Sequence, residues 1–142
     1  MERLDMLRIS SIALMALLTA CSSVPIAESE ARPIPPDRVH EAKFVRAADG
    51  LSKVVFLRDK GMSGSACDVH VYIDNTLAFT ARPGEGVDVF LESGEHFVRM
   101  DMGAGLCPAA SVSTDITLRA GEGRAYRLGF QANTGLSLVR LR

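Results

Sequence analysis

Beyond residue 50 the chain alternates between short apolar runs and turn-forming segments, and this pattern constrains the fold more than any other feature. The turn-forming segments include RPGEG, ESGE and RAGEG. The runs between them are rich in β-branched and aromatic residues, which favour strands over helices. They cover residues 52–58, 68–74, 77–82, 87–92, 96–101, 111–118, 124–130 and 136–142.

Several of these runs also alternate between apolar and polar residues. In residues 69–73, Val69, Val71 and Ile73 share one face of a strand, whereas His70 and Tyr72 share the other. Residues 87–91 and 112–118 repeat the pattern. Seven or eight strands spaced by roughly ten residues predict an all-β fold, an antiparallel β-sandwich over residues 51–142.

Composition agrees with one folded domain and argues against nucleic-acid binding. The chain has 142 residues, of which 47% are hydrophobic and 23% charged, as in globular proteins. Its formal net charge is −1, so no broad basic surface is expected for nucleic acid or an anionic membrane. The absence of Trp also disfavours a base-stacking platform.

The N-terminus carries a basic segment, with Arg3 and Arg8, followed by an apolar run over residues 9–20. A twelve-residue helix is about 18 Å long, too short for a hydrocarbon core of about 30 Å. The layout is instead that of a secretory signal peptide. Glu2 and Asp5 are unusual in its basic segment, so Met1 or Met6 can be the true start.

The apolar run ends in Leu18-Thr19-Ala20-Cys21, which resembles a bacterial lipobox. The resemblance implies a signal peptide over residues 1–20, cleavage between Ala20 and Cys21, and acylation of the Cys21 thiol. Several acyl chains would anchor the mature protein stably. Ser22, in place of Asp, resembles the pattern that directs lipoproteins to the outer membrane. The alternative is an ordinary signal peptide that contains a cysteine.

The next segment is polar and proline-rich. Residues 22–36 contain four prolines and no apolar periodicity, so we expect an extended, semi-stiff tether. Residues 39–46 fit either a turn of helix or a first edge strand. The expected organisation is therefore a lipidated Cys21 with a tether over residues 21–50, followed by the β-domain.

With Cys21 committed to lipid, Cys67 and Cys107 remain as a pair. Each lies in a glycine-rich loop before an expected strand. We expect both loops at one end of the sandwich. Export would place them in an oxidising compartment, which favours a structural disulfide. A metal site with Asp68 and His70, or a redox-active thiol, are the alternatives, but neither CxxC nor HxxxH spacing is present.

No catalytic constellation stands out. The segment around Ser63, GMSGS, lacks the spacing of a nucleophile elbow and no helical pattern follows it. The three histidines are scattered, and His96 is expected to form an exposed pair with Glu95 at a turn. We therefore predict no catalytic residue, no metal site and no cofactor.

The stretch VYIDNTLAFTARPGEGVDVFLESGEHFVRM is similar to PEGA-like domains, small β-sandwiches of bacterial envelope proteins. The wider pattern over residues 58–67, 103–107 and 120–127 resembles uncharacterised Gram-negative lipoproteins, although RPGEG replaces the motif that gives PEGA its name. The resemblance implies a binding or scaffolding module without catalytic residues.

Together these features lead to one functional expectation and one alternative. The expectation is a non-enzymatic lipoprotein on the periplasmic face of the outer membrane, which binds an envelope protein or a cell-wall ligand. The alternative is a small envelope enzyme or inhibitor that acts from the glycine-rich loops near Cys67 and Cys107.

Overall fold

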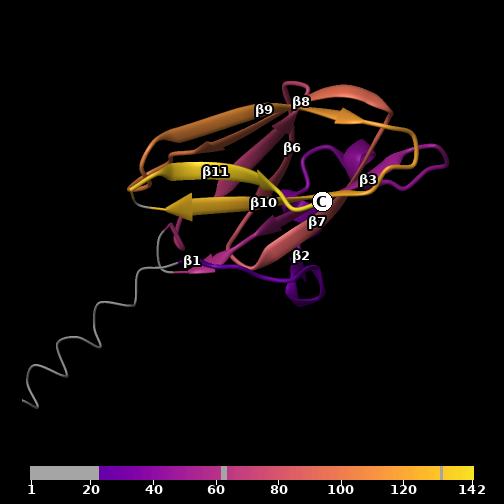
Figure 1. Ribbon diagram of the computed structural model, residues 1–142. Coiled ribbons are helices and arrows are strands. Elements are labelled where there is room, and N and C mark those ends of the chain that lie inside the picture. The colour runs from indigo at the N-terminus through magenta and orange to yellow at the C-terminus, as the bar shows by residue number, and fades with distance from the viewer. Residues whose placement is uncertain (1–22, 62–63, 132) are drawn as a thin grey trace, which may run out of the picture.

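The computed structural model describes residues 23–61, 64–131 and 133–142, in which two β-sheets pack face to face (Figure 1). One sheet has the strand order β6-β5-β8-β9 and the other β11-β10-β3-β7-β2. The first sheet consists of β5 (Val69–Ile73), β6 (Thr76–Ala81), β8 (Gly94–Met102) and β9 (Ala110–Leu118). The second consists of β2 (Arg32–Pro33), β3 (Ser52–Arg58), β7 (Glu85–Leu91), β10 (Arg124–Gln131) and β11 (Gly135–Arg140).

The core fills the space between the sheets because the alternating strands turn their apolar residues inward. Phe56 from β3 lies at its centre, with its ring centroid 5.5 Å from that of Phe79 and 5.8 Å from that of Tyr126. Val71 and Met100 from the facing sheet are also fully buried. Burial of this continuous apolar layer is the main stabilising term of the fold.

The predicted all-β sandwich is confirmed, and each of the eight expected runs contains a strand. One detail differs from a purely antiparallel arrangement. β10 pairs in parallel with β3, and β2 pairs in parallel with β7. The first pair arises because the chain crosses from one sheet to the other after β9, so that β10 runs in the same direction as β3.

The segment before β3 is part of the folded body, and we call residues 23–50 the N-terminal arm. It contains β1 (Ser23–Val24), which pairs with β4 (Lys60–Gly61), and β2. Three short 3-10 helices lie between and after these strands: η2 (Glu28–Glu30), η3 (Pro36–Arg38) and η4 (Ala42–Val45).

The predicted free tether is therefore wrong from Ser23 onward. Ile26, Ile34 and Phe44 are only 3%, 8% and 7% exposed. Ile26 packs on the outer face of the five-stranded sheet with Val55, whereas Phe44 joins the main core. Proline and polar residues dominate the composition of this arm, but these three apolar side chains pack on the sheets, so the arm is part of the folded body.

Residues 39–46, which sequence left open between helix and strand, contain elements of both. Val39 forms an antiparallel bridge with Phe79 of β6, and η4 follows as a single 3-10 turn. Among the described residues, no helix has the length and apolarity needed to cross a membrane.

The strand directions place the loops at two ends of the molecule. One end, which we call the disulfide end, consists of the described loop residues 64–68, 82–84, 103–109, 131 and 133–135. The opposite end consists of the turns around residues 49–51, 74–75, 92–93 and 119–123. β1 enters the fold at the disulfide end through its pairing with β4.

Candidate functional site

An apolar groove of about 590 Å³ lies beside β7. Its lining comes from the N-terminal arm, from η4 and from the strands β3 and β7. Apolar side chains and glycine predominate, with two carboxylates at the rim. The lining residues are Glu28, Ala31, Pro33, Ile34, Pro36, Val39, Ala42, Val45, Val55, Leu57, Gly86, Val87 and Asp88.

The groove exists because the arm follows β7 only briefly. The parallel pairing of β2 with β7 covers two residue pairs, and the Ile34 N–H then donates to the carbonyl of Gly86 at 3.3 Å. The next two residues, Pro35 and Pro36, have no N–H to continue the ladder. The arm therefore leaves β7 and crosses to β6 at Val39, which keeps an open apolar space next to the strand.

The charges at the rim of the groove are neutralised locally. The Lys53 ammonium lies 2.7 Å from a carboxylate oxygen of Asp88 and 3.8 Å from one of Glu28, and the Arg142 guanidinium lies 2.9 Å from Glu28. The hydrogen bond to Asp88 raises the pKa of Lys53. Because these charges are paired, the binding chemistry of the groove is mainly that of its apolar lining. Its volume lies within the range of about 300–1,000 Å³ that is usual for ligand pockets.

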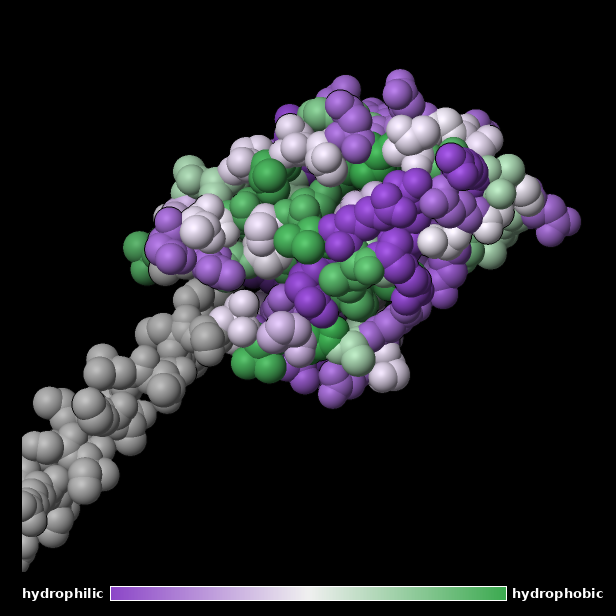
Figure 2. Space-filling model, in the orientation of Figure 1, coloured by the Kyte–Doolittle hydropathy of each residue, from purple (hydrophilic) through white to green (hydrophobic). Residues whose placement is uncertain are grey.

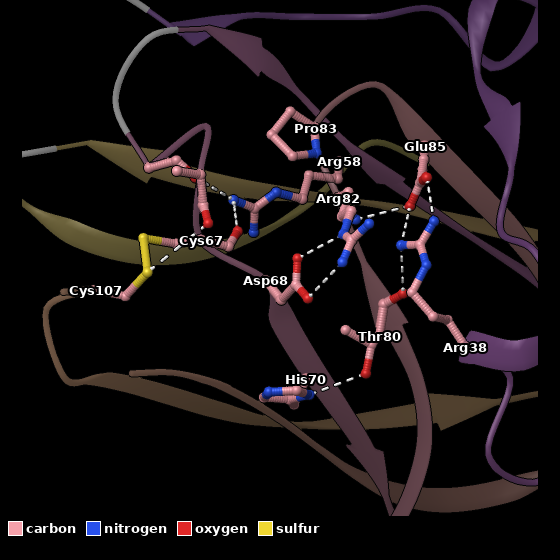
Figure 3. Close-up of polar contacts among 12 residues, drawn as sticks. Arg38, Arg58, Cys67, Asp68, His70, Thr80, Arg82, Pro83, Glu85 and Cys107 are labelled. Carbon is pink, nitrogen blue, oxygen red and sulfur yellow. Dashed lines mark hydrogen bonds and ion pairs between the residues drawn. A yellow bond between two sulfur atoms is a disulfide. The ribbon is translucent and has the colours of Figure 1, made fainter. Parts of the chain in front are cut away.

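A polar network fastens the arm to the two sheets beside this groove (Figure 3). The guanidinium of Arg38 donates two hydrogen bonds to the carboxylate of Glu85, at 2.7 and 2.5 Å. The side chains of Arg38 and Glu85 are only 13% and 5% exposed. Glu85 also accepts a hydrogen bond from the backbone N–H of Arg82, at 2.8 Å. Burial raises the pKa of Glu85, but these hydrogen bonds outweigh it and hold the pKa below its usual range.

Thr80 lies at the centre of a second set of contacts. Its hydroxyl is 2.8 Å from Nε2 of His40 and 2.9 Å from Nδ1 of His70. A hydroxyl between two imidazoles has the components of an activated nucleophile. Thr80 is only 4% exposed, however, so a substrate has no direct path to its hydroxyl. We interpret the arrangement as a structural link between the arm and the strands β5 and β6.

The predicted Cys67–Cys107 disulfide is confirmed, with a Cα–Cα distance of 5.7 Å, and it lies at one end of the sandwich (Figure 3). The buried guanidinium of Arg58 supports it by donating to the carbonyl oxygens of Gly64 and Cys67 at 3.1 and 3.0 Å. Burial lowers the pKa of Arg58. Asp68, a neighbour of Cys67, forms an ion pair with Arg82 at 2.8 Å.

The remaining sequence predictions divide into those the structure describes and those it does not. Cys21, Ala20 and the signal peptide over residues 1–20 lie outside the described residues, as does Ser63. In the part that the structure describes, no three His, Cys, Asp or Glu residues form a group able to hold a metal ion.

The expected pairing of His96 with Glu95 is wrong. His96 Nδ1 instead bonds a carboxylate oxygen of Asp74 at 2.7 Å, and its Nε2 bonds the carbonyl of Glu92 at 3.0 Å. Neighbours in a strand point to opposite faces, so the side chains of residues 95 and 96 diverge. The β5–β6 turn brings Asp74 to the ring from across the sheet.

Sequence reasoning missed the groove and the Arg38–Glu85 pair. The isolated apolar residues of the arm, such as Ile26 and Phe44, were the available signal for the packed arm. No local pattern signals the ion pair, because its partners are 47 residues apart.

Comparison with known proteins gives no further assignment: no protein-family model matches the sequence, and no curated protein matches it significantly.

Proposed function

We propose that the protein is a non-enzymatic, lipid-anchored interaction module of the bacterial envelope, and that the apolar groove beside β7 is its binding site. Acylated Cys21 would hold it on the periplasmic face of the outer membrane. The lipobox-like sequence and the resemblance to PEGA-like domains support the location and the class of protein. The groove is the observation that carries the binding role.

The lining of the groove favours a protein segment over a cell-wall glycan as the ligand. Sugars present many hydroxyl groups, and each one loses hydrogen bonds to water when it is buried against alkyl side chains. Pro36, Val39, Val45 and Val87, which are at least partly exposed, offer apolar contacts of the kind that bind the side chains of a peptide.

The edge of β7 favours an extended segment. Val87 and Asp88 lie beyond the last residue of β7 that pairs with β2, and both line the groove. A peptide in the groove would thus lie next to the backbone of a strand, where β-augmentation can supply main-chain hydrogen bonds. The proposed partner is an envelope protein that presents a short, apolar, extended segment.

The alternative, an enzyme or inhibitor acting from the loops near Cys67 and Cys107, has less support. Arg58 and the disulfide use the described part of these loops for structural contacts. We therefore assign no catalytic role to them.

A pair of alanine variants on the arm tests the binding role of the groove. Ala42 and Ala47 are both exposed on the arm, but only Ala42 lines the groove. Each is replaced by Arg in the acylated protein, which is used to capture partners from detergent-solubilised envelopes, and binding of soluble muropeptides is measured in parallel by calorimetry. We expect Ala42→Arg to abolish capture of a stoichiometric partner that wild type and Ala47→Arg retain.

Two results would contradict the proposal. Equal capture by both variants would place the partner elsewhere on the surface. Muropeptide binding that Ala42→Arg abolishes would instead assign the groove to a cell-wall ligand.

A further inference from the structure

The packed arm has a consequence for how the protein lies on a membrane. The pairing of Ser23 with Gly61 means that the folded body begins two residues after Cys21. Two residues span at most about 7 Å, whatever their conformation. Half the difference between a whole bilayer and its hydrocarbon core is about 5–8 Å, so this length does little more than cross the headgroup layer.

We propose, on the premise that Cys21 is acylated, that the disulfide end of the sandwich lies directly on the bilayer that carries the anchor, with Leu106 at the lipid interface. The protein then does not reach away from the membrane on a tether. It rests on the lipid surface in one orientation.

The chain enters the fold at this end, next to the loop of Cys67, the β8–β9 loop and the end of β10. β1 pairs with β4, which leads into the loop that contains Cys67. The disulfide joins that loop to the β8–β9 loop, which carries Leu106 beside Cys107. A Cβ on Gly64 would lie 2.6 Å from the ring of Phe130, so the end of β10 is in close contact as well.

The side chains at this end fit a lipid interface. Leu106 is fully exposed, at 106% of its reference area, and Val24 of β1 is 54% exposed. The described loop residues 64–67, 103–109, 131 and 133–135 include no Asp, Glu, Lys or Arg, and the charged residues Asp68 and Arg82 at the same end form an ion pair with each other. Figure 2 shows a small apolar patch, next to hydrophilic side chains, at the left tip of the molecule, the end at which the β8–β9 loop lies in Figure 1.

The end opposite the disulfide carries more charged side chains. Its turns and their flanks carry the basic residues Lys53, Arg119 and Arg124 together with a larger number of carboxylates, and burying these charges in a membrane interface is unfavourable. The five carboxylate residues are Asp49, Asp74, Glu92, Glu95 and Glu122. The distribution of charge therefore favours the disulfide end as the lipid-facing side.

The disulfide and Arg58 also explain why Leu106 suits this role. The disulfide ties the loop of Leu106 to the loop of Cys67, and Arg58 fixes the second loop through the carbonyls of Gly64 and Cys67, so that the exposed leucine is presented on a braced turn. A braced side chain loses less conformational entropy on contact with lipid than one on a free loop. Lys60, exposed on β4 beside Val24, is placed for its ammonium to contact lipid phosphates.

Tryptophan fluorescence tests this orientation, because the natural chain contains no Trp. Leu106→Trp and the control Ala120→Trp each introduce one fluorophore, at the disulfide end and at the opposite end. Both acylated proteins are reconstituted into phosphatidylethanolamine–phosphatidylglycerol vesicles, with or without bromine atoms on the acyl chains. We expect bromolipid to reduce the emission of Leu106→Trp at least about twofold and to leave Ala120→Trp unchanged.

The outcomes separate this inference from the premise on which it rests. Mass spectrometry of the purified protein establishes whether Cys21 carries acyl chains, and an unmodified Cys21 would overturn both the anchor and the orientation. With Cys21 acylated, an unquenched Leu106→Trp, or equal quenching of the two variants, would overturn the orientation alone. The groove test with Ala42→Arg would be unaffected by that result.

Discussion

Arg38 and Glu85 lie 47 residues apart in the chain and form a buried ion pair with two hydrogen bonds, which fastens the N-terminal arm to the start of β7 (Figure 3). Arg38 ends η3, and it also donates to the backbone carbonyl of Thr80 in the other sheet, at 3.3 Å. One side chain thus connects the arm to both layers of the sandwich. The wall of the groove depends on this contact, because the arm supplies much of its lining.

The first prediction concerns this ion pair. Arg38→Ala leaves the buried carboxylate of Glu85 without its charged partner, and we expect the free energy of unfolding to fall by about 3 kcal/mol. Arg82→Ala is the control, because it removes the exposed ion pair with Asp68 and should cause a much smaller loss. Urea denaturation measures both. Equal losses would show that burial of the Arg38–Glu85 pair has no special effect.

The second prediction concerns acid. The pKa of Glu85 lies below its ordinary value of 4.5 in the folded protein. The stabilisation by ionised Glu85 is therefore complete above about pH 4.5, and it is lost as the pH falls through the lower pKa of Glu85 in the folded protein. Denaturation midpoints between about pH 6 and pH 3 should fall more steeply for wild type than for Glu85→Gln, which has no proton to gain. Parallel curves would contradict this expectation.

The third prediction concerns neutral pH. Burial of the His96 ring lowers its pKa, but the contacts with Asp74 and with the carbonyl of Glu92 raise it by more. The net result is a pKa above the ordinary 6.5. The stabilisation by protonated His96 is thus complete below about pH 6.5 and is lost as the pH rises through the folded-state pKa. In the His96→Gln variant, the loss of stability between about pH 6 and pH 8 should disappear. In the control variant Glu95→Gln, the same loss of stability should remain. Thermal melts at several pH values provide the measurement.

The fourth prediction concerns the disulfide. Cys67 and Cys107 are 40 residues apart, and a loop of that size corresponds to about 4 kcal/mol on the chain-entropy estimate. The double variant Cys67→Ala/Cys107→Ala should be destabilised by about that amount. Dithiothreitol should destabilise wild type similarly and leave the double variant unchanged. An unaltered denaturation midpoint in reduced wild type would argue against a stabilising role for the disulfide.

The fifth prediction concerns the proposed anchor. Cys21→Ser removes the thiol that would be acylated, so the protein should move from the membrane to the soluble fraction. Ser22→Asp keeps the thiol and should leave the protein on a membrane, but on the inner rather than the outer one. Fractionation of cells followed by immunoblotting measures both variants. Cys21→Ser protein that remains with the outer membrane would show that another contact holds it there.

Much of the fold followed from local sequence. Alternation such as that of Val69, Val71 and Ile73 identifies a strand with one buried face, because successive side chains in a strand point to opposite faces. The same reasoning placed Cys67 and Cys107 in loops before strands, where the structure joins them. These features depend on residues close together in the chain.

The candidate site could not be predicted in this way. Residues 22–36 have the composition of a tether, and isolated apolar residues such as Ile26 and Ile34 do not by themselves specify which surface of the sheets they pack on. Periodicity and turn chemistry thus determined the strands and the all-β class of the fold. Only the tertiary structure decided that Arg38 reaches Glu85, that the arm packs on the sheets and that a groove remains beside β7, because each of these depends on side chains that are distant in sequence and meet only when the sheets and the arm have assembled.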